Sequence, residues 1–151
     1  VKAFNLPSIE LANYEADDLI ATYAKKIIKA GAKVTVISSD KDFMQLVSEK
    51  IRLYDPMKSK VLGEKEVIEK FGVKPNQVID VQSLAGDSSD NVPGVPGIGI
   101  KTASELINKY KTLDILLKKA NEIPQNKRRE TLLANKDKAL LSRQLVTLKK
   151  L

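Results

Sequence analysis

Apolar residues recur at helical spacing near the start of the chain. Between residues 17 and 30 the apolar positions are Leu19, Ile20, Tyr23, Ala24, Ile27 and Ile28. This spacing predicts an amphipathic helix, for which Gly31 is a suitable C-terminal stop. Residues 33–38 are a β-branched run long enough only for a strand, and residues 42–47 predict a short helix. A helix, a strand and a helix in succession are typical of α/β architecture.

The pattern then changes from strands to helices. The elements expected next are strands at 51–54 and 59–62, joined by a turn at Asp55-Pro56, and helices at 64–71 and 76–85. Those expected last are helices at 101–110, 113–120, 127–135 and 136–148, and no strand pattern follows Leu62. We therefore predict an α/β domain over residues 1–85 and an all-helical region over residues 86–151.

Composition narrows the possible chemistry. The 151 residues suffice for one medium domain or two small ones, and no apolar run approaches the ~20 residues of a membrane span. The chain contains neither cysteine nor histidine, which excludes disulfides, zinc–thiolate or zinc–histidine sites and a Ser-His-Asp triad. Any hydrolytic chemistry must therefore depend on carboxylates, lysines or metal-bound water.

Positive charge is concentrated toward the C-terminus. Residues 101–151 carry 13 Lys/Arg against 5 Asp/Glu, whereas residues 1–100 carry 13 against 14. A basic half indicates a polyanion partner such as nucleic acid, and a well-solvated surface is the alternative. The basic run Lys127, Arg128 and Arg129 leaves the same two choices open, an extended DNA-binding surface or a solvated helix start.

Seven carboxylates occur in three groups along the chain. They are Glu15, Asp17 and Asp18 in YEADD, Asp40 and Asp42 in SSDKD, and Asp87 and Asp90 in GDSSDN. Each group alone has a structural explanation as a helix cap, a turn cap or an Asx turn. If the three loops meet, however, the carboxylates would repel one another strongly without cations. Two or three divalent ions would relieve that repulsion and would activate water for phosphodiester cleavage.

The third acidic group runs into a Gly/Pro-rich turn, and residues 92–107 fit a helix-hairpin-helix pattern. Gly97 and Gly99 would let the backbone approach a phosphate, toward which the amides of the next helix point. Lys101 and Thr102 add a cation and a hydroxyl, so we predict sequence-independent, salt-sensitive binding of a DNA backbone. A tight helix–helix turn is the alternative. The apolar positions expected in the core here are Ile98, Leu106, Ile107 and Tyr110.

Taken together, these motifs resemble the 5′-nuclease domains of bacterial DNA polymerase I, which belong to the flap endonuclease superfamily. The stretches that carry the resemblance are YEADD, SSDKDFMQL, LAGDSSDNVPGVPGIGIKTA and LLSRQLVTL, in the family's order and spacing. The resemblance implies a partial PIN-like (Rossmann-like) sheet domain followed by an all-α helix-three-turn-helix region. It also implies 5′→3′ exonuclease and 5′-flap endonuclease activity on DNA, used in RNA primer removal, nick translation and repair in the bacterial cytoplasm.

The same resemblance implies ligands and partners. A two-metal site for Mg²⁺ or Mn²⁺ would use Glu15 and Asp17 for the first ion, and Asp40, Asp42 and Asp90 for the second. Asp18 and Asp87 would be accessory acids. Backbone carbonyls within residues 92–97 would bind K⁺, and the turn, with Gly97, Gly99 and Lys101, would hold duplex DNA downstream of a flap, a nick or an RNA–DNA primer junction. The expected partner domain is a polymerase in the parent chain.

The resemblance also places family features upstream of Val1, namely a first strand with a metal-binding Asp, a basic helical arch and a Lys/Arg pair. We therefore expect a monomeric fragment that cleaves weakly or not at all but retains duplex binding. Two other functions stay open. A non-enzymatic helix-hairpin-helix module would use the acids only as caps, and a PIN-type ribonuclease would prefer single-stranded RNA.

Overall fold

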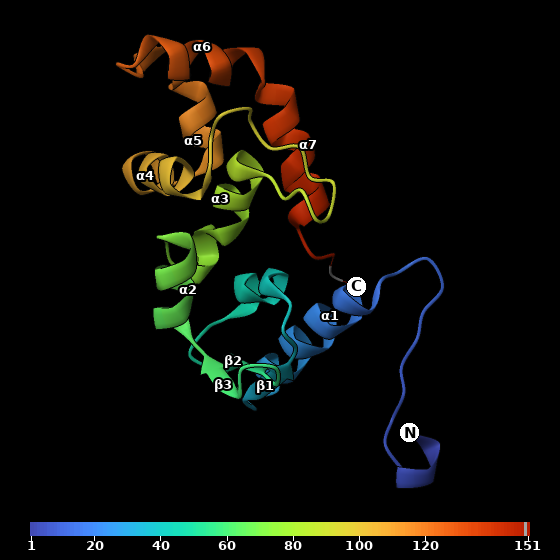
Figure 1. The fold of residues 1–151 in the computed structure, drawn as a ribbon. Helices are drawn as coiled ribbons and strands as arrows, with labels where there is room; N and C mark the ends of the chain where they lie inside the picture. Colours follow the sequence, from blue (N-terminus) through green and yellow to red (C-terminus); the bar gives the residue numbers. More distant parts are fainter. Residues whose placement is uncertain (150) are drawn as a thin grey trace.

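The computed structural model describes residues 1–149 and Leu151, and it confirms the predicted α/β class with a helical second part (Figure 1). The sheet part contains α1 (Ala16–Lys29), β1 (Val34–Ile37), β2 (Ile51–Asp55), β3 (Lys60–Leu62) and α2 (Glu64–Phe71). The helical part contains α3 (Val78–Ala85), α4 (Ile100–Tyr110), α5 (Leu113–Lys118), α6 (Asn126–Ala134) and α7 (Lys136–Val146). Within the described residues, the short 3₁₀ turns are η1 (Lys2–Phe4), η2 (Lys41–Leu46), η3 (Pro75–Gln77) and η4 (Ala120–Glu122). In this described part, no helix is both long and apolar enough to span a bilayer.

The sheet has three strands in the order β1-β2-β3. Strands β1 and β2 are parallel, with Val36 opposite Leu53, and β2 and β3 are antiparallel, with Tyr54 opposite Val61. Every predicted helix and strand is present with small shifts at its ends, except that the helix expected at 42–47 is the 3₁₀ turn η2. Because the parallel strands end at one edge of the sheet, the loop after β1 that carries Asp40 lies at that edge.

Helix α3 joins the two parts of the molecule. It packs against α4 and α7 on the helical side, and η2 on the sheet side also contacts it. Val78, Val81 and Leu84 of α3 are fully buried, and they belong to one apolar cluster that extends from Ala21 in α1 to Ala139 in α7. The core is therefore continuous across both parts, and the boundary at residues 85 and 86 stays a prediction.

The end of α7 is tied back to the sheet part by side chains that bind backbone. Gln45 Nε2 donates to the carbonyl of Val146 (2.8 Å), and Gln45 Oε1 accepts from the Leu148 N–H (3.2 Å). Asp18 Oδ1 accepts from the Lys149 N–H (2.8 Å), and Thr22 Oγ1 accepts from the Leu151 N–H (3.1 Å). These bonds hold α1 and η2, which carry two of the acidic groups, against the end of the helical part.

Two glycines bring the loop after α3 into backbone contact with the end of that helix. Gly86 and Gly94 both have positive φ, and a Cβ added at Gly94 would lie 2.5 Å from the Gly86 nitrogen. A Cβ at Gly86 would lie 2.7 Å from the carbonyl oxygen of Val92. The Gly94 N–H also donates to Ser142 Oγ of α7 (2.9 Å). The loop that carries Asp87 and Asp90 is thus fixed where no side chain fits.

We predict that Gly94→Ala lowers the free energy of unfolding by about 2–4 kcal/mol, since it combines a left-handed φ with a backbone clash. Gly97→Ala is the matched control, because Gly97 also has positive φ (74°) but no described atom lies within 4 Å of its added Cβ. Gly97→Ala should lower the free energy of unfolding by only about 1–2 kcal/mol. Urea denaturation measures both values, and equal losses for the two variants would contradict the proposed steric origin.

Candidate metal centre and nucleic-acid interface

The three acidic groups lie at the starts of helical elements or in the loop that follows one. Glu15 is the N-cap residue of α1, and Asp17 lies in the first turn of that helix. Asp40 is the N-cap residue of η2, where its Oδ1 accepts a hydrogen bond from the Asp42 N–H (2.8 Å). Asp87 and Asp90 belong to the loop after α3, in which Asp87 and Val92 exchange two backbone hydrogen bonds. Asp40 and Asp87 thus accept the local backbone bonds of a cap and an Asx turn, whereas the Glu15 side chain caps no amide of α1.

Electrostatics shows that the three groups are neighbours. Burial, followed by the charges of Asp40, Glu15, Asp42 and Asp18, raises the pKa of Asp17 above its ordinary value. Burial also raises the pKa of Asp42, and the charges of Asp40, Asp90 and Asp87 add to that effect. The first group therefore interacts with the second, and the second interacts with the third. The fold concentrates negative charge here instead of spreading it over the surface.

A buried aspartate outside the acidic groups shapes the loop that carries Asp40. Asp55, at the end of β2, is 2% exposed, and its Oδ1 accepts hydrogen bonds from Ser39 Oγ (2.6 Å) and from the Met57 N–H (3.0 Å). The bond from Ser39 is the main reason that the pKa of Asp55 lies below its ordinary value. Asp55 thus stays ionised and anchors Ser39, the residue before Asp40.

Gln82 of α3 holds the Asp42 carboxylate from inside the protein. Its side-chain Nε2 donates to Asp42 Oδ1 (2.8 Å), although Gln82 is only 3% exposed. The other end of the amide, Oε1, is buried and has no hydrogen-bond partner among the described residues. A buried acceptor without a hydrogen bond lowers the stability of the folded chain. The bond from Nε2 to Asp42 is the interaction that favours this orientation of the Gln82 amide despite that cost.

Asp87 and Asp18, like Asp40 and Asp42, have protein partners. Asp87 forms an ion pair with Lys41, whose Nζ also donates to Ser89 Oγ (3.3 Å). Burial alone would raise the pKa of Asp87, but the hydrogen bonds from Lys41 and Ser89 outweigh it and leave the pKa below its ordinary value. Asp18 is 6% exposed and binds the Lys149 backbone, which gives it a structural role.

The donor set suits a hard divalent cation in chemistry and charge, since it consists of carboxylate oxygens, which Mg²⁺ and Mn²⁺ prefer as ligands. Across residues 1–149 and Leu151, however, no group of three or more Asp and Glu side chains lies close enough together to hold a metal ion. Charges from the three groups act on Asp17 and Asp42, but in the described residues the carboxylates do not converge on one point. The assignments of Glu15, Asp17, Asp18, Asp40, Asp42, Asp87 and Asp90 as metal ligands stay predictions.

The Gly/Pro-rich turn leads into α4 as the sequence predicts. Gly99 is the N-cap residue of α4, and no described atom lies within 4 Å of a Cβ added at Gly97 or Gly99. That side of the turn is therefore open to a ligand, whose approach the first free amides of α4 favour. Lys101 is exposed and Thr102 half-buried. The four apolar residues expected in the core, Ile98, Leu106, Ile107 and Tyr110, are all buried.

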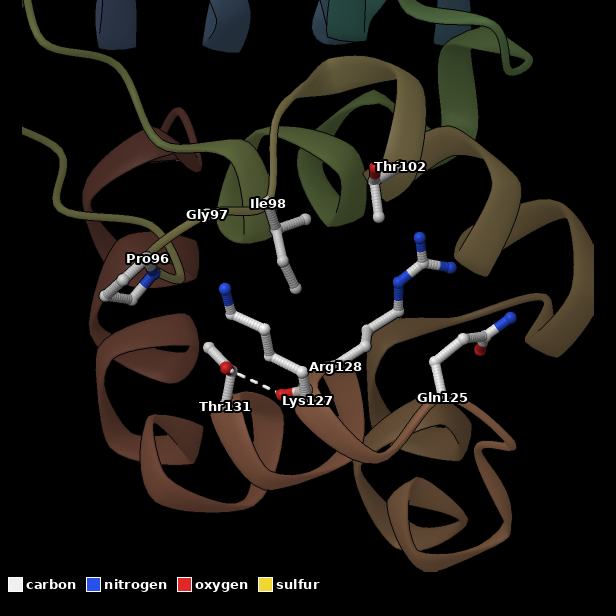
Figure 2. Close-up of a pocket in the computed structure, with 8 residues that line it drawn as sticks. All are labelled: Pro96, Gly97, Ile98, Thr102, Gln125, Lys127, Arg128 and Thr131. Atoms are coloured by element: carbon white, nitrogen blue, oxygen red, sulfur yellow. Dashed lines mark hydrogen bonds between the residues drawn. The ribbon is translucent and has the colours of Figure 1, made fainter.

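Two cavities connect this turn with other parts of the molecule. One, of about 420 Å³, has Lys41 and Asp87 among its lining residues at the acidic end and Gly99 and Ile100 at the turn. The other, of about 350 Å³, lies between the turn and the start of α6, and Figure 2 shows Lys127 and Arg128 extending into it. The turn thus lies between the acidic region and a basic helix start.

Gln82 and Lys41 are site residues that the sequence analysis did not find. Gln82 lies on α3 beside the buried Val78 and Val81, so a polar residue on an apolar helix face was the available signal. Lys41 stands between Asp40 and Asp42 in the sequence. This alternation of charges does not indicate that Lys41 forms its ion pair with Asp87, which is remote in sequence.

Comparison with known proteins identifies the family. Residues 1–72 match the family model for the N-terminal resolvase-like domain of 5′-3′ exonucleases, and residues 73–151 match the model for their C-terminal SAM fold. The chain belongs to the 5′-3′ exonuclease family. It is 59% identical over 148 residues to DNA polymerase I of Rhizobium leguminosarum, which covers 98% of the chain but only 15% of that protein. It is 42% identical over 140 residues to a 5′-3′ exonuclease of Aquifex aeolicus, covering 90% of the chain and 48% of the relative.

The fold of this family member also matches a solved structure. The D15 flap endonuclease of bacteriophage T5, in a pseudo-enzyme-product complex with DNA and metal ions, superimposes with a TM-score of 0.86 at 24% identity. The match covers 97% of the chain and 54% of the phage protein. The chain spans less than two thirds of each of these proteins, so the activity of the longer proteins has to be proposed for this chain.

We predict that Asp17→Asn raises the free energy of unfolding at neutral pH without divalent cations, because it removes a charge that is partly buried and that is repelled by its acidic neighbours. The pKa of Asp17 is raised in the folded state, so the wild-type chain regains stability as pH falls through that pKa. The advantage of the variant should therefore vanish below pH 3.8, the ordinary value for this group. Thermal denaturation in EDTA at both pH values measures this difference.

Asp137→Asn provides the control, because Asp137 also lies in the first turn of a helix but is exposed on α7. That change loses only a favourable helix-dipole interaction and should not stabilise the protein. Equal effects of the two substitutions at neutral pH would show that the acidic neighbours of Asp17 are not the cause.

We also predict that Gln82→Leu raises the pKa of Asp42 further, since the hydrogen bond from Gln82 is the interaction that lowers it. The free energy of unfolding should change by less than about 1 kcal/mol, because the substitution removes the unpaired Oε1 together with the bond. A carboxyl-carbon NMR titration measures the pKa, and Glu66, bound by the Gly63 N–H, is the internal reference that should not shift. An unchanged Asp42 titration would contradict the geometry described here.

Proposed function

We propose that this chain provides the carboxylates and the DNA-binding turn of a structure-specific 5′ nuclease. The reaction is hydrolysis of phosphodiester bonds in DNA, as a 5′→3′ exonuclease and 5′-flap endonuclease, on duplexes with a 5′ flap or a nick and at RNA–DNA primer junctions. Its cellular uses would be RNA primer removal, nick translation and repair, next to a polymerase domain. Support comes from membership of the 5′-3′ exonuclease family and from the T5 flap endonuclease relative with DNA and metal ions.

The observation that carries the proposal is that the fold brings the three acidic loops within range of one another's charges. Beyond the effect of burial, the charges of Asp40 and Asp42 act on Asp17, and those of Asp90 and Asp87 act on Asp42. A protein that used these acids only as caps would have no reason to concentrate them, because each like charge nearby lowers stability. Divalent cations bound between the carboxylates would replace this repulsion with attraction between each carboxylate and the cation.

We assign the cofactors as Mg²⁺ or Mn²⁺, with Glu15 and Asp17 serving one ion and Asp40, Asp42 and Asp90 serving the other. Bound ions would supply charge neutralisation at the scissile phosphate and activation of water. The catalytic set in this assignment is Asp17, Asp40, Asp42 and Asp90. Asp18 and Asp87 act as accessory acids, and Lys41 must release Asp87 before that carboxylate can serve a cation.

The remaining residues bind and orient the substrate. Gly97, Gly99, Lys101 and Thr102 would hold backbone phosphates of the duplex, with K⁺ bound by carbonyls within residues 92–97. The cavity lined by Gly99, Ile100, Lys41 and Asp87 leads from this turn to the acids. A strand held at the turn can therefore pass its next phosphates toward the carboxylates.

The test is cleavage of a labelled 5′-flap duplex in Mg²⁺ and in Mn²⁺. It is measured with the chain itself and with a chimera in which the chain replaces the matched region of the Aquifex aeolicus 5′-3′ exonuclease. We expect the chimera to cleave at the flap junction. Asp40→Asn should lower the rate at least about 100-fold with little change in DNA affinity. Asparagine keeps the Oδ1 that caps η2, so the fold is preserved.

Lys101→Ala is the complementary variant and should weaken DNA binding while flattening its salt dependence. A folded chimera that binds the flap duplex but never cleaves it would favour a non-enzymatic helix-hairpin-helix module. Preference for single-stranded RNA over the flap would favour a PIN-type ribonuclease. Either outcome would overturn the proposed activity.

A further inference from the structure

The cavity between the Gly/Pro-rich turn and α6 has two walls that are far apart in sequence. Pro96, Gly97, Ile98 and Thr102 form the wall on the turn side. Lys127, Arg128 and Thr131 are on the α6 side, and the cavity measures about 350 Å³. In Figure 2 the Lys127 side chain extends toward Pro96 and Gly97, whereas the Arg128 guanidinium extends toward Thr102.

The three consecutive cations at the start of α6 have different surroundings. Arg129 is used structurally, since it donates to the carbonyl of Ile123 (2.8 Å) and to Asn126 Oδ1 (2.7 Å) and so closes the first turn of its own helix. Lys127 and Arg128 form no side-chain hydrogen bond or ion pair with any described residue. Lys127 is exposed and Arg128 is half-buried.

Neighbouring acids do not explain this arrangement. Glu105 borders an adjacent cavity that Arg128 also lines, but the two side chains form no ion pair in the described structure. Two cations held at one cavity repel each other, and burial of Arg128 adds a desolvation cost. A bound anion would remove both penalties, and the free amides at the start of α4 favour the same charge on the opposite wall.

We propose that this cavity is a second phosphate seat for the nucleic-acid backbone, with Lys127 and Arg128 as its cationic wall and Thr102 and the turn as its other wall. The proposal rests on the proposed function, in which the turn binds duplex DNA. The seat places α6 against the same duplex. The basic run therefore divides into two roles: Arg129 stabilises the start of its own helix, whereas Lys127 and Arg128 extend the DNA-binding surface. Contacts of this kind hold the backbone and carry no sequence preference.

The test is fluorescence anisotropy of a labelled 5′-flap duplex titrated with the chain at several salt concentrations. The double variant Lys127→Gln/Arg128→Gln should bind at least about tenfold more weakly, and its slope of log affinity against log salt should fall by about 2. Two duplexes of unrelated sequence should show the same loss. The matched control Lys118→Gln/Lys138→Gln removes the same charge from exposed positions on α5 and α7 and should change the slope far less. Thermal denaturation verifies that both variants fold.

Several outcomes separate this inference from the proposed function. If the wild-type chain binds no duplex, DNA binding at the turn fails as well. If Lys101→Ala weakens binding while Lys127→Gln/Arg128→Gln behaves like the control, the second seat alone is wrong. Stabilisation by inorganic phosphate that the double variant loses, with unchanged DNA binding, would assign the cavity to a small anion and overturn the proposal.

Discussion

The contact between Gly86 and Gly94 is the constraint on which the two functional regions depend. Asp87 follows the first glycine directly, and the turn that leads to α4 follows the second. Because the two backbones touch with no room for a side chain, the acidic loop and the turn cannot shift independently. The Gly94 N–H bond to Ser142 extends this constraint to α7. Through the hydrogen bonds at the end of α7, it reaches α1 and η2, where the other acids lie.

Concentrated carboxylates lower the stability of the folded chain, and the surrounding structure offsets that cost. Asp55 is kept ionised by Ser39 and by backbone N–H groups, and it fixes the loop before Asp40. Gln82 holds Asp42 even though its own Oε1 then lacks a partner. Lys41 neutralises Asp87 internally. Gln82 and Lys41 thus bind a carboxylate directly, whereas Asp55 acts through the loop that carries Asp40.

The sequence predicted the helices and the strands because hydrophobic period and turn residues are local signals, whereas it left open whether the three acidic loops meet. It also placed Ile98 and Tyr110 in the core correctly. It could not reveal that Gln82 reaches Asp42 or that Lys41 pairs with Asp87, since both contacts join segments about forty residues apart or more whose side-chain directions depend on packing. For the same reason it could not separate Arg129 from Lys127 and Arg128. Three adjacent cations look alike in a sequence, and only the helix start distinguishes the one that binds its own backbone.

The opposite charges of the two regions imply that cation binding and DNA binding are linked. In the proposed nuclease the basic half would attract the duplex, while the cavity from the turn leads to Asp87 and to the neighbouring acids, where negative charge is concentrated. Phosphates that approach the acids without cations therefore meet repulsion, whereas bound cations reverse the sign of that interaction. Linkage is reciprocal, so DNA held at the turn must strengthen cation binding at the acids by the same factor. In the proposed nuclease, the acidic region is thus completed only when both ligands are present.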